Sequence, residues 1–174
     1  MKKAKLFLVC AFWLMAAVVG NSAVAEEFVA ADFIRFAAAK NMSEVAAAKR
    51  ALKMSTSAEV KAYAQRRLDE QAVLRAPLEA LAQQEGVTLD YSQQGSYVFI
   101  RKGETFDTAY ANKRAAELKR MVRVMRKAML AENPDVRRYA EQALPVLMQH
   151  WYQSQQLVRA LNNPVPTDSL LATR

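Results

Sequence analysis

The stretch at residues 134–161, PDVRRYAEQALPVLMQHWYQSQQLVRAL, decides the fold of this chain. Apolar, small or weakly polar side chains recur along it in alternating steps of four and three residues, at Val136, Ala140, Ala143, Leu147, His150, Ser154, Leu157 and Leu161. This spacing places them on one narrow face of an α-helix. Asn133 is suited to cap the first turn, and Pro134 fits the first helical position, where no amide hydrogen is needed. The only histidine of the chain therefore lies on the face that we expect to be buried.

Residues 1–25 have the pattern of a secretory signal peptide. Three lysines precede an apolar run at residues 6–19, and a small-x-small cleavage site ends at Ala25. The apolar run is too short for a membrane-spanning helix. A lipoprotein is the competing interpretation because Cys10 lies in the leader, but Val9 stands where a small residue is required. We therefore expect cleavage after residue 25 and export, most simply to a bacterial periplasm.

Cleavage would leave 149 of the 174 residues, which is enough for one domain with its own core. The single cysteine leaves with the leader, so the exported chain could form no disulfide, zinc–cysteine site or cysteine nucleophile. Loss of the leader lysines lowers the formal net charge from +8 to about +5. Beyond the leader no apolar run approaches the length of a membrane span, and we expect a protein that does not cross a membrane.

The remaining chain is rich in good helix formers and poor in glycine. It divides into four amphipathic segments, at 32–54, 56–86, 105–131 and 134–161. The first and third connections are short, which favours antiparallel neighbours. We predict an all-α, antiparallel four-helix bundle over residues 26–162, with one long connection between helices two and three. A flexible tail is expected at 163–174.

The boundaries of these segments carry their own signals. We expect Asp32 to cap the first helix and the TSAE sequence at 56–59 to open the second as a capping box. Gly86 should end the second helix. Pro77 and Pro145 lie inside helices two and four, and each is expected to bend its helix. In the long connection, the run at 97–100 (YVFI) is open between a short strand and a helical turn.

Five segments carry a family resemblance by their order: FIRFAAAKNMSEV, AEVKAYAQRRLDEQ, EGVTL, GETFDTAY and RRYAEQALPVLMQHW. Together they resemble the secreted bacterial family called domain of unknown function 4142, whose members are often labelled outer membrane proteins. The likeness extends over residues 33–161. It implies a ferritin-like helical bundle and export, and it implies no established reaction.

Departures from the family pattern concern its histidines. The family usually carries Asp-His pairs at two places that read Glu70-Gln71 and Glu117-Leu118 here. Its histidine in the fourth helix and its glutamate in the first are kept as His150 and Glu44. Two of the three family histidines are therefore replaced, one of them by a hydrocarbon side chain.

The midpoints of the four predicted helices share one layer of the bundle interior, which would bring together Glu44, Gln71, Leu118 and His150. Di-metal bundles place Glu-x-x-His pairs in such a layer, and this chain has none. One histidine with Glu44, and with Glu70 beside the apolar face, is a poor iron or manganese site. We expect no metal and no cofactor, and a buried Glu44–His150 hydrogen bond instead. The alternative is a metal-binding ferritin-like protein (storage, sensing or oxidation) that uses Glu44 and His150, and haem is a further possibility.

Other chemistry has weaker support. Met121, Met125 and Met129 follow one another at four-residue spacing, which could suggest copper binding but is more typical of core filling. The sequence has no nucleophile-elbow pattern and no phosphate-binding glycine loop. We therefore expect a protein that is not an enzyme, acting as an envelope binding or structural protein.

One surface feature remains, on the third predicted helix. Six basic residues fall on the side opposite its apolar face, and we call them the basic arc: Lys113, Lys119, Arg120, Arg123, Arg126 and Lys127. The simplest interpretation is a solvated helix face. The alternative is docking to an anionic envelope surface, such as lipid headgroups or an acidic polymer. The charge would also suit nucleic acid, which the export signal disfavours.

Overall fold

The computed structural model describes residues 29–92, 100 and 102–163, and this part of the chain is all-α, which confirms the predicted fold class. Its helices are α1 (Ala30–Met54), α2 (Ala58–Asp69), α3 (Gln71–Gln84), α4 (Phe106–Ala128) and α5 (Pro134–Asn162). The predicted leader, the run at 97–99 and the tail from residue 164 lie outside the described residues. None of the described helices is long and apolar enough to cross a membrane.

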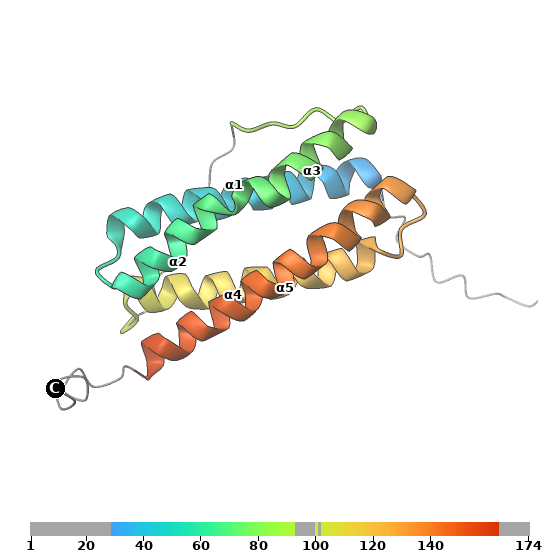
Figure 1. Ribbon diagram of the computed structural model, residues 1–174. Coiled ribbons are helices and arrows are strands. Elements are labelled where there is room, and N and C mark those ends of the chain that lie inside the picture. Colours follow the sequence, from blue (N-terminus) through green and yellow to red (C-terminus); the bar gives the residue numbers. More distant parts are fainter. Residues whose placement is uncertain (1–28, 93–99, 101, 164–174) are drawn as a thin grey trace, which may run out of the picture.

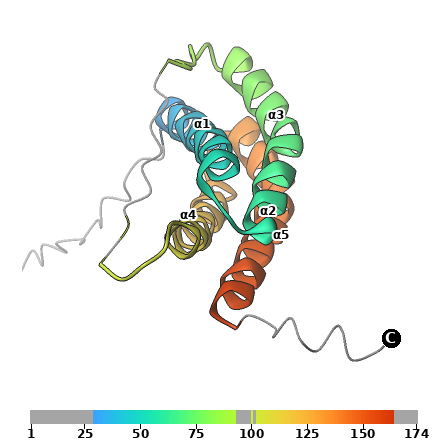
Figure 2. The ribbon, with the colours of Figure 1, turned by 90° about the vertical axis from the view of Figure 1, so that its left-hand side faces the viewer.

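Two helical hairpins pack against each other to form the bundle (Figures 1 and 2). In the first hairpin α1 folds back on α2 and α3, and in the second α4 folds back on α5. The contacts between the hairpins join α1 to α4, and both α2 and α3 to α5. Figure 1 shows α1 and α4, and likewise α3 and α5, running in opposite directions. Because α3 ends and α4 begins at opposite ends of the bundle, the connection between them spans its length. This geometry explains the one long connection in the sequence.

Most helix ends follow the sequence signals. Asn133 caps α5 by accepting hydrogen bonds from the next free amides, with Pro134 in the first turn, as predicted. Ser57 caps α2 through a hydrogen bond from the amide of Val60, one residue after the start of the predicted capping box. The chain leaves α3 at Gly86, whose φ of 64° suits glycine. The first helix differs from the prediction: it begins at Ala30, so Asp32 lies inside its first turn and not at the cap.

The second predicted helix is interrupted at Glu70, which separates α2 from α3. The amide of Val73 bonds the Glu70 carbonyl in a three-residue turn, so the winding is locally tighter than an α-helix. This break lies almost two turns before Pro77, beyond the one-turn reach of the proline ring, and α3 continues through Pro77. The prediction placed a bend of this segment at Pro77, whereas the structure interrupts it at Glu70.

The apolar core consists of two clusters of buried side chains. The larger is built around Phe33, Ile34, Leu78, Met125 and Tyr139. The smaller lies toward the other end of the bundle and contains Ala48, Val60, Ala64, Tyr110 and Leu157. Met121 and Met125 belong to the larger cluster, which confirms that they fill the core. Polar side chains occupy the level between the clusters, and this level is the candidate site.

Candidate functional site

Helices α1, α2, α4 and α5, together with the residue between α2 and α3, contribute charged or polar side chains to the level between the two apolar clusters. We call this set the charged layer, and it consists of Lys40, Glu44, Arg67, Glu70, Arg114, Glu117 and His150. Glu44, Arg67, Arg114 and His150 lie in the four-three spacing of the apolar faces, and Lys40, Glu70 and Glu117 lie one residue beside it. The charged layer therefore separates the two apolar clusters of the core.

Arg114 of α4 is the most deeply buried charge, with only 1% of its surface exposed. Its guanidinium donates a short hydrogen bond to Oε1 of Glu44 on α1. A buried guanidinium without an acid would carry a large desolvation cost, and Glu44 offsets that cost. The Arg114–Glu44 pair therefore joins the two hairpins through the core.

Arg67 of α2 is the second buried cation, 6% exposed. Its Nη1 atom lies 3.4 Å from Oε2 of Glu70, and the same oxygen lies 3.0 Å from Nε2 of His150 on α5. The Glu70 carboxylate thus contacts both Arg67 of α2 and His150 of the opposite hairpin. Glu70 lies between α2 and α3, and from this position its carboxylate reaches both side chains.

Lys40 and Glu117 complete the layer at its solvent edge, where each side chain is about a quarter exposed. Their Nζ–Oε2 distance is 2.8 Å, and the pair bridges α1 and α4 beside Arg114–Glu44. Burial raises the pKa of Glu117, but the hydrogen bond and the charge of Lys40, together with Arg114 and Lys113, lower that pKa overall. Glu117 is therefore held as a carboxylate.

His150 is 2% exposed, which confirms the prediction that it is buried. Burial is the main cause that lowers its pKa to about 3, and the positive charge of Arg67 acts in the same direction. The Glu70 carboxylate acts in the opposite direction, but it is shared with Arg67. The imidazole is therefore neutral near pH 7.

Several buried polar atoms of this region have no hydrogen-bond partner among the described residues. They include Nε of Arg67, Nε and Nη2 of Arg114, Nδ1 of His150, and the hydroxyl oxygens of Tyr63 and Tyr110. Burial raises the pKa of both tyrosines, and the nearby charge of Glu44 raises it further. Arg67 also lines a cavity of about 40 Å³, together with Asn41, Gln71 and Leu118. The charged layer thus borders a small space that is polar on one side and apolar on the other.

The predicted Glu44–His150 pair is wrong. Glu44 is bound by Arg114, and His150 contacts Glu70. The four predicted layer positions do occur at one level, since Glu44, Gln71 and Leu118 line the same cavity and His150 lies next to Arg67. The prediction did not include the two buried arginines. Arg114 pairs with Glu44, and Arg67 and His150 share the carboxylate of Glu70.

Arg67 and Arg114 had a signal in the sequence. Both fall on the apolar faces of their segments, in the same four-three steps as the core residues. A long cation at such a position either extends to solvent or demands a buried acid. Pairing could not be read from one helix alone, because the acid for Arg114 comes from a segment about 70 residues away.

The donor set of the layer does not fit a metal centre. Among the described residues no group of three or more histidine, cysteine, aspartate or glutamate side chains is placed to hold an ion. The carboxylates of Glu44 and Glu70 face guanidinium groups, whose charge would repel a metal cation. The arrangement neutralises its own charges inside the bundle and presents no open coordination site.

The basic arc lies on the outer side of α4. Lys119, Arg120, Arg123, Arg126 and Lys127 are exposed, and Lys113 is half-buried. The sequence from 119 to 127 contains no acid, and Glu117 is engaged by Lys40. The six predicted residues therefore share one side of α4.

Comparison with known proteins gives one match. The sequence model of a family described as a domain of unknown function, DUF4142, matches residues 15–157. No curated protein and no solved structure matches this chain. The matched range includes both the charged layer and the basic arc, so both features lie inside the family domain.

Proposed function

The chain belongs to the DUF4142 family, whose function is unknown, and from this premise we propose an exported, non-enzymatic bundle that docks on an anionic surface of the cell envelope. The basic arc is the observation that carries the proposal. A helix face with five exposed cations and no acid from 119 to 127 is a positive surface, which attracts anionic partners. The leader pattern at residues 1–25 supports the envelope as the compartment.

The internal charges support a binding role over a metal-dependent one. In the charged layer each acid faces a cation, so the rival use of Glu44 and His150 as metal ligands would first require removal of Arg114 and Arg67. On the arc, in contrast, the cations face outward, where a partner can reach them. The bundle then acts as a rigid support that holds α4 in place.

Binding to vesicles that contain an anionic lipid tests the proposal. Cations close to an anionic surface contribute about 1 kcal/mol each, so reversing Arg120, Arg123 and Lys127 to Glu should weaken binding at least about 100-fold. Wild-type binding should also fall steeply as salt rises past about 0.1 M, where screening acts within about 10 Å. Co-sedimentation of the exported chain over a salt series measures both effects.

A matched control separates the arc from overall charge. Reversing Lys49, Arg50 and Lys53 to Glu changes the net charge equally, at exposed positions near the end of α1. The control should retain most of the binding. Equal losses in the two triple variants would mean that net charge and not the arc attracts the surface, and wild type that ignores anionic vesicles and anionic polymers at low salt would refute the proposal.

A further inference from the structure

Leu130 is an unusually exposed apolar side chain. Its exposed fraction is 85%, whereas Tyr152, the next among the described large apolar residues, reaches 56%. It lies just past the last residue of α4, in the turn that leads to α5. Nothing in the core or in the charged layer explains why a leucine should project from this point.

Leu130 points in the same direction as the basic arc. The chain keeps winding as a helix beyond Ala128, because Met129 has helical angles and the amide of Leu130 bonds the Lys127 carbonyl. Such a turn winds by about 100 to 120° per residue, so Leu130 falls within the directions spanned by Lys119 and Lys127. The exposed leucine is therefore flanked by cations on the face that carries the basic arc.

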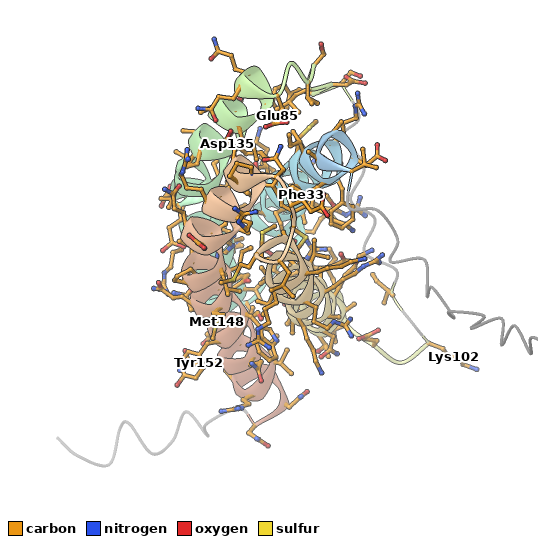
Figure 3. All side chains as sticks on the ribbon, turned by 90° about the vertical axis from the view of Figure 1, so that its right-hand side faces the viewer. Phe33, Glu85, Lys102, Asp135, Met148 and Tyr152 are labelled. Carbon is orange, nitrogen blue, oxygen red and sulfur yellow. The ribbon has the colours of Figure 1, made fainter. Side chains whose placement is uncertain are left out.

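The turn that presents Leu130 is tied down on its inner side. Nη1 of Arg137 donates to the carbonyl oxygens of Ala131 and Glu132, at 2.7 Å each. Ala131 is buried, and Nδ2 of Asn133 donates to Glu85 at the end of α3. Figure 3 shows Glu85 and Asp135 at this same end of the bundle. Leu130 is thus held outward by a fixed turn, and its exposure does not come from a loose end.

Acidic residues occur in the turn itself and in the first turn of α5. Asp135 is paired with Arg138 at 2.9 Å. Glu132 is the exposed acid within the turn itself, two residues beyond Leu130. On the α4 side of Leu130, the charged residues from 119 to 127 are all basic.

An apolar side chain among cations distinguishes between anionic partners. An acidic polymer in water offers charge alone, and burial of a leucine adds little to its binding. A lipid surface offers anionic headgroups and, directly beneath them, acyl chains that can take up an apolar side chain. Resting on the proposed function above, we propose that the basic arc and Leu130 form a lipid-docking surface on which α4 lies flat while Leu130 enters the acyl boundary.

The experiment compares Leu130→Gln and Leu130→Phe with wild type on two probes. One probe is phosphatidylcholine vesicles containing phosphatidylglycerol, and the other is dextran sulfate, which carries charge without acyl chains. Burying a leucine-sized group is worth about tenfold in affinity, so Leu130→Gln should bind the vesicles about tenfold more weakly and dextran sulfate equally well. Leu130→Phe should retain vesicle binding. Met148→Gln, at an exposed apolar residue on the outer side of α5, should change neither (Figure 3).

The possible outcomes separate this inference from the proposed function. If Leu130→Gln binds vesicles as tightly as wild type, or loses binding to both probes equally, lipid insertion is wrong while docking through the arc can still stand. The same holds if wild type binds dextran sulfate but not the vesicles. If the triple reversal on α4 leaves both probes bound, the proposed function itself fails. If wild type self-associates in solution and Leu130→Gln does not, the leucine belongs to an interface between copies, which overturns the lipid assignment.

Discussion

Helix α4 carries arginines in two contrasting regions of the molecule. Arg114 lies in the charged layer, 1% exposed and bound to Glu44. Arg120 and Arg123, six and nine residues further on, are exposed, and the sequence from 119 to 127 contains no acid. The same residue type on the same helix thus holds the bundle together in one place and faces solvent in the other. Burial and the nearest acid decide between these roles, and sequence composition does not.

The two regions should respond differently to mutation. A buried ion pair is costly to break, because the remaining charge stays buried without compensation. An exposed cation is surrounded by water, and its loss changes stability little. The charged layer should therefore control folding, and the basic arc should control binding.

The largest effect is expected for Glu44→Ala. It leaves the buried Arg114 guanidinium without its acid, and we expect a loss of about 3 to 5 kcal/mol in the free energy of unfolding. Urea titration followed by circular dichroism measures the loss. The matched change on the exposed face, Arg120→Ala, should stay within about 0.5 kcal/mol.

The double variant Glu44→Leu with Arg114→Leu sharpens this test. With both charges removed no buried charge is left uncompensated, so the double variant should be more stable than Glu44→Ala alone. A loss below about 1 kcal/mol for Glu44→Ala would show that solvent already screens the pair and that the two regions differ less than their burial suggests.

A smaller effect is expected from acid. The pKa of His150 is lowered to about 3 in the folded chain, mainly by burial, whereas an unfolded histidine titrates near 6.5. Between these values only the unfolded chain takes up the proton, so stability falls as pH falls through this window. From this residue alone, the loss between neutral pH and pH 5 is about 2 kcal/mol.

His150→Gln provides the comparison for the acid effect. The variant lacks the titrating ring, so the difference in unfolding free energy between pH 7.5 and pH 5 should be smaller than in wild type. Urea titrations at the two pH values measure it. Equal pH dependence in the two proteins would mean that His150 takes up its proton in the folded bundle, with Glu70 outweighing burial and Arg67.

The smallest effect is expected from metal ions. Because Arg67 and Arg114 face the acids of the layer, iron, manganese or zinc should shift the melting temperature of wild type by no more than a few degrees. A site filled at a hundred times its dissociation constant would add about 2.7 kcal/mol, which a melting curve detects easily. Gln71→His with Leu118→His should bind metal only when Arg114→Leu is added. Two tightly bound ions per wild-type chain would contradict our description of the layer.

The sequence predicted the fold class and the buried face of each helix well, and the reason is local. Side chains at four-three spacing share a helix face whatever the rest of the chain does, so the burial of His150, Leu118 and Met125 followed from their positions alone. The Asn133 cap was equally predictable, since capping involves amides only two and three residues away.

Pairing inside the layer could not be predicted in this way. Glu44 and His150 both lie at the middle level, but Glu44 pairs with Arg114 and His150 contacts Glu70. Each of these contacts joins two different hairpins, so the periodicity of one helix does not predict it. The sequence beside Glu70 also contains no proline or glycine that would predict the interruption. It was visible only once α2, α3 and α5 were packed together.

The sequence by itself determined that this chain forms amphipathic helices, which side of each is buried, and that α4 carries a face of unbroken positive charge. These are properties of residues within a few turns of one another. Only the tertiary structure decided which acid neutralises which buried arginine and that Leu130 projects among the cations of the basic arc. Those outcomes depend on contacts between helices distant in sequence and on hydrogen bonds that hold the turn after α4.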